Sequence, residues 1–131
     1  MKPFKKNLLT MYYALFSDKI PIYDDDGNPT LETEQGYLPP VQFKANLSAG
    51  NSMLDEQPFG SNVSYDRVIL LYDESPIDEH ALIWVNKEPV IMVGGYPDPD
   101  SADYEVSGAP LIFQPDNRKW RTERIPIRRR V

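Results

Sequence analysis

Thirteen prolines and seven glycines, spread along a chain of 131 residues, constrain this fold more than any other sequence feature. Proline lacks a backbone N–H and disrupts the interior of a helix, so prolines at this density disfavour long helices. The chain is divided into short segments, for which short β-strands are the natural structure. A length of 131 residues is typical of one domain with a single modest core, so we expect residues 1–131 to form one domain.

Hydrophobic periodicity predicts strands in several of these segments. Residues 41–47 alternate apolar and polar side chains, the pattern of an antiparallel strand with one buried face. Residues 67–72 form a continuous apolar run, which predicts a central strand buried on both faces. Further strands are expected at 10–16, 19–23, 81–85, 90–93, 104–113 (a strand pair or one bent strand) and 120–127, where Pro126 favours an edge.

Turns and one long loop are predicted between these strands. Ser17 and Asp18 are expected to turn, and residues 24–29 form a surface turn in which Asp26-Gly27 suits a positive φ. Residues 48–64 are small, polar or acidic and predict a long loop. About seven strands with almost no helix predict an all-β fold, a small antiparallel β-barrel or sandwich with a long loop and an extended basic C-terminus.

Charge is distributed unevenly along the chain. Residues 1–6 carry three lysines, and residues 116–131 carry seven Lys or Arg against two acids, whereas the whole chain has a net charge of −6. The body between these ends is therefore strongly acidic, which favours solubility and repels nucleic acid. We predict that residues 1–6 and 128–131 are basic terminal extensions that contact other surfaces. The alternative is that the arginines at 128–130 form a solvated, frayed tail.

The chain contains no cysteine, which excludes disulfides and thiolate metal sites. A reducing compartment, or a particle assembled in one, is therefore expected. Lysines precede an apolar stretch at residues 8–16, but this stretch contains polar side chains and lacks a small-residue cleavage site, so no signal peptide is predicted. No run approaches the roughly 18 apolar residues of a membrane-spanning helix, and no membrane partner is expected.

Metal and catalytic chemistry is not predicted. An EF-hand with Gly27 at its sixth position would place Ile22 and Thr33 where carboxylates are required, so the aspartates before Gly27 are interpreted as a turn. The aspartates at 98, 100 and 103 are interpreted as an exposed loop, and His80, the only histidine, cannot form a zinc site alone. A hydrolase with paired carboxylates stays a distant alternative. We expect no enzyme activity and no cofactor.

Aromatic residues are expected mainly in the core, because the chain offers no basic groove beside them for stacking bases. Trp84 lies between Ile83 and Val85 and is predicted to be buried. Trp120 lies between Lys119 and Arg121 and is the better candidate for a protein interface, since tryptophan and arginine are enriched at contact centres.

The order of several short motifs resembles that in a known protein family, across roughly residues 11 to 107. No single motif is diagnostic, and the likeness lies in the ordered set. The motifs are Met11-Tyr12-Tyr13-Ala14-Leu15, Ile20-Pro21-Ile22-Tyr23, Asp26-Gly27-Asn28, Pro40-Val41-Gln42-Phe43-Lys44-Ala45-Asn46-Leu47-Ser48, Phe59-Gly60, Tyr65-Asp66, Leu82-Ile83-Trp84 and Ser101-Ala102-Asp103-Tyr104. In this order they resemble the head–tail connector proteins, of head-closure or stopper type, of phages with long non-contractile tails.

This resemblance implies a β-barrel subunit of a ring in the virion neck, assembled in the host cytoplasm. The ring, of about six or twelve copies, would lie below the portal and its adaptor and above a tail-completion or tail-tube protein. It would close the filled head, with transient contact to packaged DNA. A loop that projects into the channel is typical of such proteins, and the candidate residues here are Asn51, Met53, Leu54, Asp55, Glu56 and Phe59.

Contacts between subunits or between rings are assigned to the basic C-terminal region: Trp120, Arg121, Arg124, Arg128, Arg129 and Arg130. Arginine forms bidentate pairs with carboxylates, so these side chains suit the acidic body of an adjacent copy. Members of the family end in a lysine-rich strand whereas this chain ends in arginines, so the resemblance does not identify the neighbour that they contact. The alternative function is a non-enzymatic β-sandwich binding module, adhesin-like or regulatory.

Overall fold

The computed structural model of the protein describes residues 8–48, 65–72, 75–113 and 122–130. The all-β fold expected from the sequence is confirmed, with a barrel and two one-turn 3₁₀ helices. The strands and 3₁₀ helices are β1 (Leu9–Ala14), β2 (Phe16–Tyr23), β3 (Pro29–Tyr37), β4 (Val41–Leu47), β5 (Arg67–Leu71), β6 (Leu82–Trp84), η2 (Val93–Gly95), η3 (Pro99–Ser101), β7 (Tyr104–Val106), β8 (Leu111–Phe113) and β9 (Thr122–Arg129).

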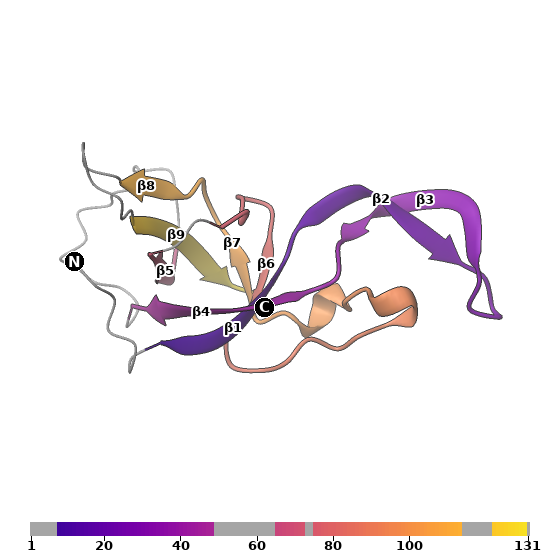
Figure 1. Ribbon diagram of the computed structural model, residues 1–131, viewed down its shortest axis with the longest axis horizontal. Coiled ribbons are helices and arrows are strands. Elements are labelled where there is room, and N and C mark those ends of the chain that lie inside the picture. The colour runs from indigo at the N-terminus through magenta and orange to yellow at the C-terminus, as the bar shows by residue number, and fades with distance from the viewer. Residues whose placement is uncertain (1–7, 49–64, 73–74, 114–121, 131) are drawn as a thin grey trace.

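Six strands close into an antiparallel barrel in the order β5-β4-β1-β6-β7-β9, with β9 pairing back onto β5 (Figure 1). The closure removes the free edges that an open sheet of this size would expose. Strand β5, predicted as central, lies between β4 and β9, and Val68, Ile69 and Leu71 are buried. The predicted alternation in β4 is also confirmed, because Phe43, Ala45 and Leu47 belong to the core cluster or pack against it.

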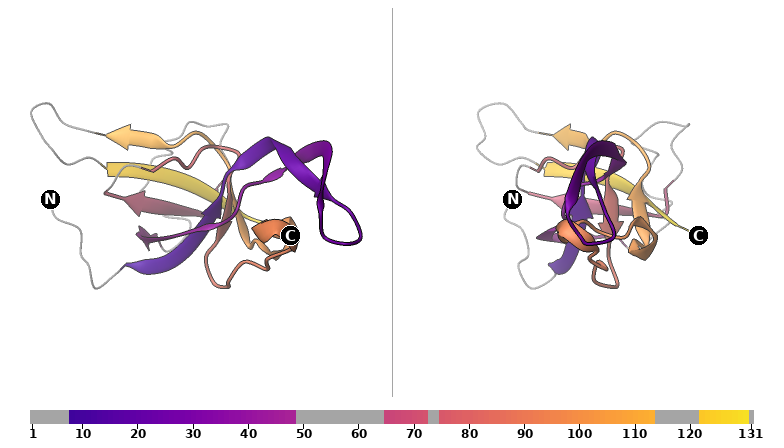
Figure 2. Two further views of the ribbon diagram at one scale, coloured as in Figure 1. Left: turned by 45° about the vertical axis from the view of Figure 1, so that its right-hand side comes forward. Right: turned by 90° about the vertical axis from the view of Figure 1, so that its right-hand side faces the viewer.

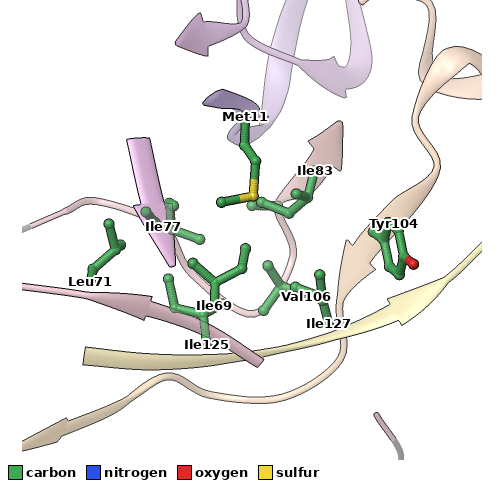
Figure 3. Close-up of a cluster of buried hydrophobic side chains, with 11 residues drawn as sticks. Met11, Ile69, Leu71, Ile77, Ile83, Tyr104, Val106, Ile125 and Ile127 are labelled. Carbon is green, nitrogen blue, oxygen red and sulfur yellow. The ribbon is translucent and has the colours of Figure 1, made fainter. Parts of the chain in front are cut away.

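The barrel interior is filled by aliphatic side chains from opposite walls. Met11, Ile69, Ile83, Ile125 and Ile127 are fully buried and point toward one another in Figure 3. Each large aliphatic side chain contributes about 1.5–3 kcal/mol when it is removed from water. These residues come from strands far apart in the sequence, so the core is formed only when the barrel closes.

Trp84 anchors a second, smaller buried cluster with Ala14, Leu82 and Ala102. Its burial agrees with the sequence prediction. The indole Nε1 donates to the Ser101 hydroxyl at 2.9 Å, and this hydroxyl also accepts from the Val90 N–H at 3.2 Å. The same hydroxyl donates to the Asp98 carbonyl at 2.6 Å. Ser101 therefore joins the loop that follows β6 to the barrel wall.

Pro126 does not lie at an edge, as the sequence had suggested. It is buried within β9, opposite Val68 on one side, while β7 and β8 pair with β9 on the other side. The chain leaves β9 after Val106 and returns at Leu111, and the Pro126 carbonyl accepts from the Ser107 N–H in this gap. Proline has no backbone N–H to donate. Pro126 lies where the pairing of β9 with β7 and β8 is interrupted, so no hydrogen bond between strands is lost. Of the two possibilities for residues 104–113, the bent strand is the nearer description.

A long hairpin of β2 and β3 projects from the barrel beside the loop at residues 86–99, and together they form an arm (Figures 1 and 2). The predicted turn at residues 24–29 joins the two strands. The Asp24 carboxylate accepts from the N–H groups of Asp26 and Asn28, and Gly27 has φ 81°. The loop packs on the hairpin through the Tyr23 and Tyr96 rings, whose centroids are 6.3 Å apart.

Three local predictions were wrong. Ser17 and Asp18 do not turn but lie within β2, where the pairing with β3 shifts register. Strand β3 was not predicted, because its side chains are mostly polar and it buries none of them. Residues 90–93 do not form a strand: they carry one isolated bridge, Ile91 to Pro97, and enter the 3₁₀ turn η2. No described strand pairs with this apolar run, and its side chains stay about half exposed.

Candidate functional site

The predicted contact residues are placed only in part. Asn51, Met53, Leu54, Asp55, Glu56 and Phe59, together with Trp120 and Arg121, lie outside the described residues. The other four arginines are described: Arg124, Arg128 and Arg129 lie in β9 and Arg130 follows it directly. Residues 128 and 129 were expected in a terminal extension, but they are the last two residues of β9, the longest strand of the barrel.

Arg128, Arg129 and Arg130 are each held by the barrel. The Arg128 guanidinium forms an ion pair with Glu105 at 3.2 Å, in which both side chains are partly exposed. The Arg129 N–H donates to the Asp66 carboxylate at 2.7 Å, and the Arg130 N–H donates to the Asp103 carbonyl at 3.0 Å. The frayed tail considered from the sequence is therefore wrong for residues 128–130.

Arg129 also contacts an aromatic ring. Its guanidinium carbon lies 5.9 Å from the centroid of the Tyr104 ring, and Nη2 donates to the Tyr104 hydroxyl at 3.5 Å. The hydrogen bond with Tyr104 raises the pKa of the Arg129 guanidinium, and the nearby carboxylates of Asp66 and Asp103 act in the same direction. Arg129 is thus a fixed positive charge at one end of the barrel.

Arg124 differs from the other three arginines. It is exposed on β9, directly opposite Leu111 of β8, and forms no ion pair with any residue in the described part of the chain. Side chains of directly opposed residues lie on the same face of a sheet. Arg124 therefore presents, among the described residues, a positive charge without an ion-pair partner beside an apolar side chain.

Strand β8 exposes three apolar side chains in succession. Leu111, Ile112 and Phe113 are 42%, 51% and 60% exposed, and among the described strands β8 pairs only with β9. One edge of β8 thus has no strand partner in the described structure. We call Leu111, Ile112, Phe113 and Arg124 the β8 surface.

A second apolar surface lies on the arm. Val90, Ile91, Met92 and Val93 are each about half exposed, and Leu31 of β3 is fully exposed. The hairpin turn lies beside them, because a methyl group added at Gly27 would contact Val93. The turn also carries the exposed carboxylate of Asp25. We call Val90, Ile91, Met92, Val93 and Asp25 the arm surface.

The arm surface was missed by sequence reasoning, which assigned the apolar run at 90–93 to a strand. One sequence signal could have found it. Prolines at 89, 97 and 99 bracket the run, and glycines follow it at 94 and 95, so a continuous ladder is excluded on both sides. An apolar run that cannot pair or fold back is left on the surface.

Hollows open at several places on the described surface. One groove lies between the hairpin and the loop, with Ile20, Tyr23, Met92 and Tyr96 among its lining residues. Two hollows beside Arg130 mix acidic and basic side chains, one with Asp103 and Lys87 and the other with Glu79, His80 and Glu105. Among the described residues no three His, Cys, Asp or Glu side chains are grouped to hold a metal ion.

The carboxylates of Asp98 and Asp103 accept backbone N–H groups at the base of the arm. Asp98 Oδ1 accepts from the Asp100 N–H at 3.1 Å and caps η3. Both oxygens of Asp103 accept backbone N–H groups, from Val85 at 2.8 Å and Asn86 at 3.0 Å. These acids therefore fix the base of the arm.

No family model, curated protein or solved structure matches this chain. Across residues 8–48, 65–72, 75–113 and 122–130, no helix is long and apolar enough to span a membrane.

Proposed function

We propose that this protein is a noncatalytic structural subunit of the head–tail connector in the neck of a tailed phage. Identical copies would form a ring below the portal or adaptor ring and above the tail-completion or tail-tube protein. In this position the ring closes the filled head and joins it to the tail. The protein acts through its shape and surface charge, and makes or breaks no covalent bond.

One observation supports this proposal most. Four of the motifs that resemble the connector family fall on strands that are neighbours in the barrel, although they are far apart in the sequence. Residues 11–15 cover most of β1, residues 40–48 and 82–84 contain β4 and β6, and residues 101–104 reach the first residue of β7; the barrel order is β4-β1-β6-β7. Motifs on adjacent strands are expected if the chain shares this part of the barrel with the connector family. Chance matches would not be expected to fall on adjacent strands.

Surface charge is consistent with a channel through which DNA moves. The chain has a net charge of −6, and the exposed hairpin turn at residues 24–28 carries three aspartates. An acidic wall repels the phosphate backbone and so limits adhesion of DNA. The exposed apolar side chains of the arm surface and the β8 surface suit contacts with other proteins, because a monomer gains nothing by exposing them.

Deletion of the gene from the phage that encodes it tests the proposal. Particles lacking the protein should contain filled heads that leak DNA and lack tails in electron micrographs, and the wild-type gene supplied in trans should restore tailed particles. Labelling of the protein in intact virions should place it between head and tail. Complete, infectious, tailed particles without the protein would refute the proposal, and labelling on tail fibres would favour the adhesin-like alternative.

A further inference from the structure

The arm surface and the β8 surface lie at opposite ends of the molecule. In Figure 1 the β2–β3 hairpin and its loop occupy one end of the long axis, and β8 lies at the other end; Figure 2 shows the same separation. The two surfaces therefore cannot meet within one chain. A contact between them requires a second copy.

The two surfaces are chemically complementary. Each combines exposed apolar side chains with one charged group: Met92 and Val93 with Asp25 on the arm, and Leu111 and Phe113 with Arg124 on β8. The charges are opposite in sign. Neither Asp25 nor Arg124 has an ion-pair partner among the residues that the structure describes, so an Arg–carboxylate pair across the contact displaces no existing bridge.

The residues around the arm surface carry a charge of the same sign as the charged group of that surface, whereas the exposed charge of the β8 surface is positive. The hairpin at residues 16–37 carries six acids and one lysine, whereas the end of β9 that pairs with β8, residues 122–124, carries Arg124 and one acid, Glu123, which is buried. Two surfaces with electrostatic potentials of opposite sign attract and orient each other, whereas two surfaces of the same sign repel each other. An arm therefore repels another arm and is attracted to the β8–β9 side of the barrel.

We propose that the arm of one copy docks on the β8 surface of the next copy, in a head-to-tail contact between identical chains. Such a contact uses two different patches on each subunit, so it repeats from copy to copy and closes into a ring where the rotation permits. This inference deepens the proposed function, because it assigns the surfaces through which ring subunits join. It commits to a second copy of this chain as the partner.

Disulfide trapping tests the contact directly, because the natural chain has no cysteine. In the double variant Met92→Cys/Phe113→Cys, mild oxidation of the concentrated protein should yield a ladder of covalent multimers on non-reducing gels. Phe113 is chosen because, like Leu111, it lies on the same face of the sheet as Arg124. Each single variant should stop at dimers, since one cysteine joins at most two chains. The matched control is Lys44→Cys/Phe113→Cys, which moves one thiol to an exposed position on β4.

A ladder that forms at least about tenfold faster in the Met92/Phe113 pair than in the Lys44/Phe113 control supports docking; equal rates indicate random collision and overturn it. Charge reversal gives a second, independent readout in the same trap. Asp25→Arg or Arg124→Asp alone should suppress the ladder, and the two reversals together should restore it. Failure of the combined reversal to restore laddering rejects the Asp25–Arg124 pairing.

The outcome is separable from that of the gene deletion. If particles without the protein lack tails but the Met92/Phe113 pair behaves like its control, the neck function stands and the arm-to-β8 contact is wrong. If the ladder forms but phage particles are normal without the protein, the contact between copies stands and the neck function is wrong.

Discussion

Ser101→Ala is the substitution for which the structure makes the sharpest stability prediction. The Ser101 hydroxyl uses all of its hydrogen-bonding capacity: it accepts from Trp84 Nε1 and from the Val90 N–H, and it donates to the Asp98 carbonyl. Ser101 and Trp84 are both buried, so water cannot replace the lost hydroxyl. Alanine therefore leaves the indole N–H without an acceptor in the barrel wall and releases the loop at Val90.

The expected cost follows from the groups left unpaired. An unsatisfied buried donor costs about 1–3 kcal/mol, and the substitution removes the acceptor of two donors, one of which is fully buried. We expect the free energy of unfolding to fall by about 3 kcal/mol. For a domain of this size, that loss lowers the melting temperature by about 10 °C.

Ser107→Ala is the matched control. The Ser107 hydroxyl is also buried, but it has no hydrogen-bond partner within the described structure, so its removal should change the unfolding free energy by less than about 0.5 kcal/mol. Urea titration followed by tryptophan fluorescence measures both variants. In a Trp84→Phe background, which lacks the indole N–H, Ser101→Ala should cost about 1–2 kcal/mol less. Equal effects of the two serine substitutions would refute the reasoning.

Three further predictions follow from the arm and the core. Gly94 and Gly95 both have positive φ, so alanine costs about 1 kcal/mol at either site, but at Gly94 the new methyl group also collides with Tyr23. Gly94→Ala should therefore increase amide exchange in the arm more than Gly95→Ala, and equal exchange would contradict the predicted collision. Asp103→Ala removes the acceptor of two backbone N–H groups and should lower the unfolding free energy by about 1–3 kcal/mol in urea; an unchanged midpoint would show that water replaces it. Ile69→Ala should cost about 2–5 kcal/mol by the same assay, since the side chain is fully buried, and a loss below 1 kcal/mol would mean that the barrel collapses around the cavity.

The strands that the sequence predicted well are those with strong local patterns. The alternation at 41–47 and the apolar run at 67–72 became β4 and β5, and the Asp-Gly turn became the tip of the hairpin. These features depend on the periodicity of apolar side chains and on the backbone preferences of individual residues. Both are properties of residues that are adjacent in the sequence. Burial of Trp84 followed in the same way from its apolar neighbours.

The candidate surfaces could not be predicted, because exposure depends on which elements pack together. The run at 90–93 has the composition of a buried strand and is exposed only because prolines and the 3₁₀ turn keep it from pairing. Pro126 has the signature of an edge residue, yet it is buried in the sheet, where its missing N–H is tolerated because the gap between β7 and β8 falls opposite it. Arg124 gained its apolar neighbour Leu111 only when β8 paired with β9.

Residue order alone determined that this protein would be built of short β-strands, with an acidic body and basic ends, because proline spacing, side-chain alternation and charge are properties of neighbouring residues. The tertiary structure decided the closure of the barrel, the projection of the arm and the pairing of charge with exposed apolar groups at its two ends. Those features arise from contacts between strands distant in sequence, whose register is set by the shared core and not by any one segment.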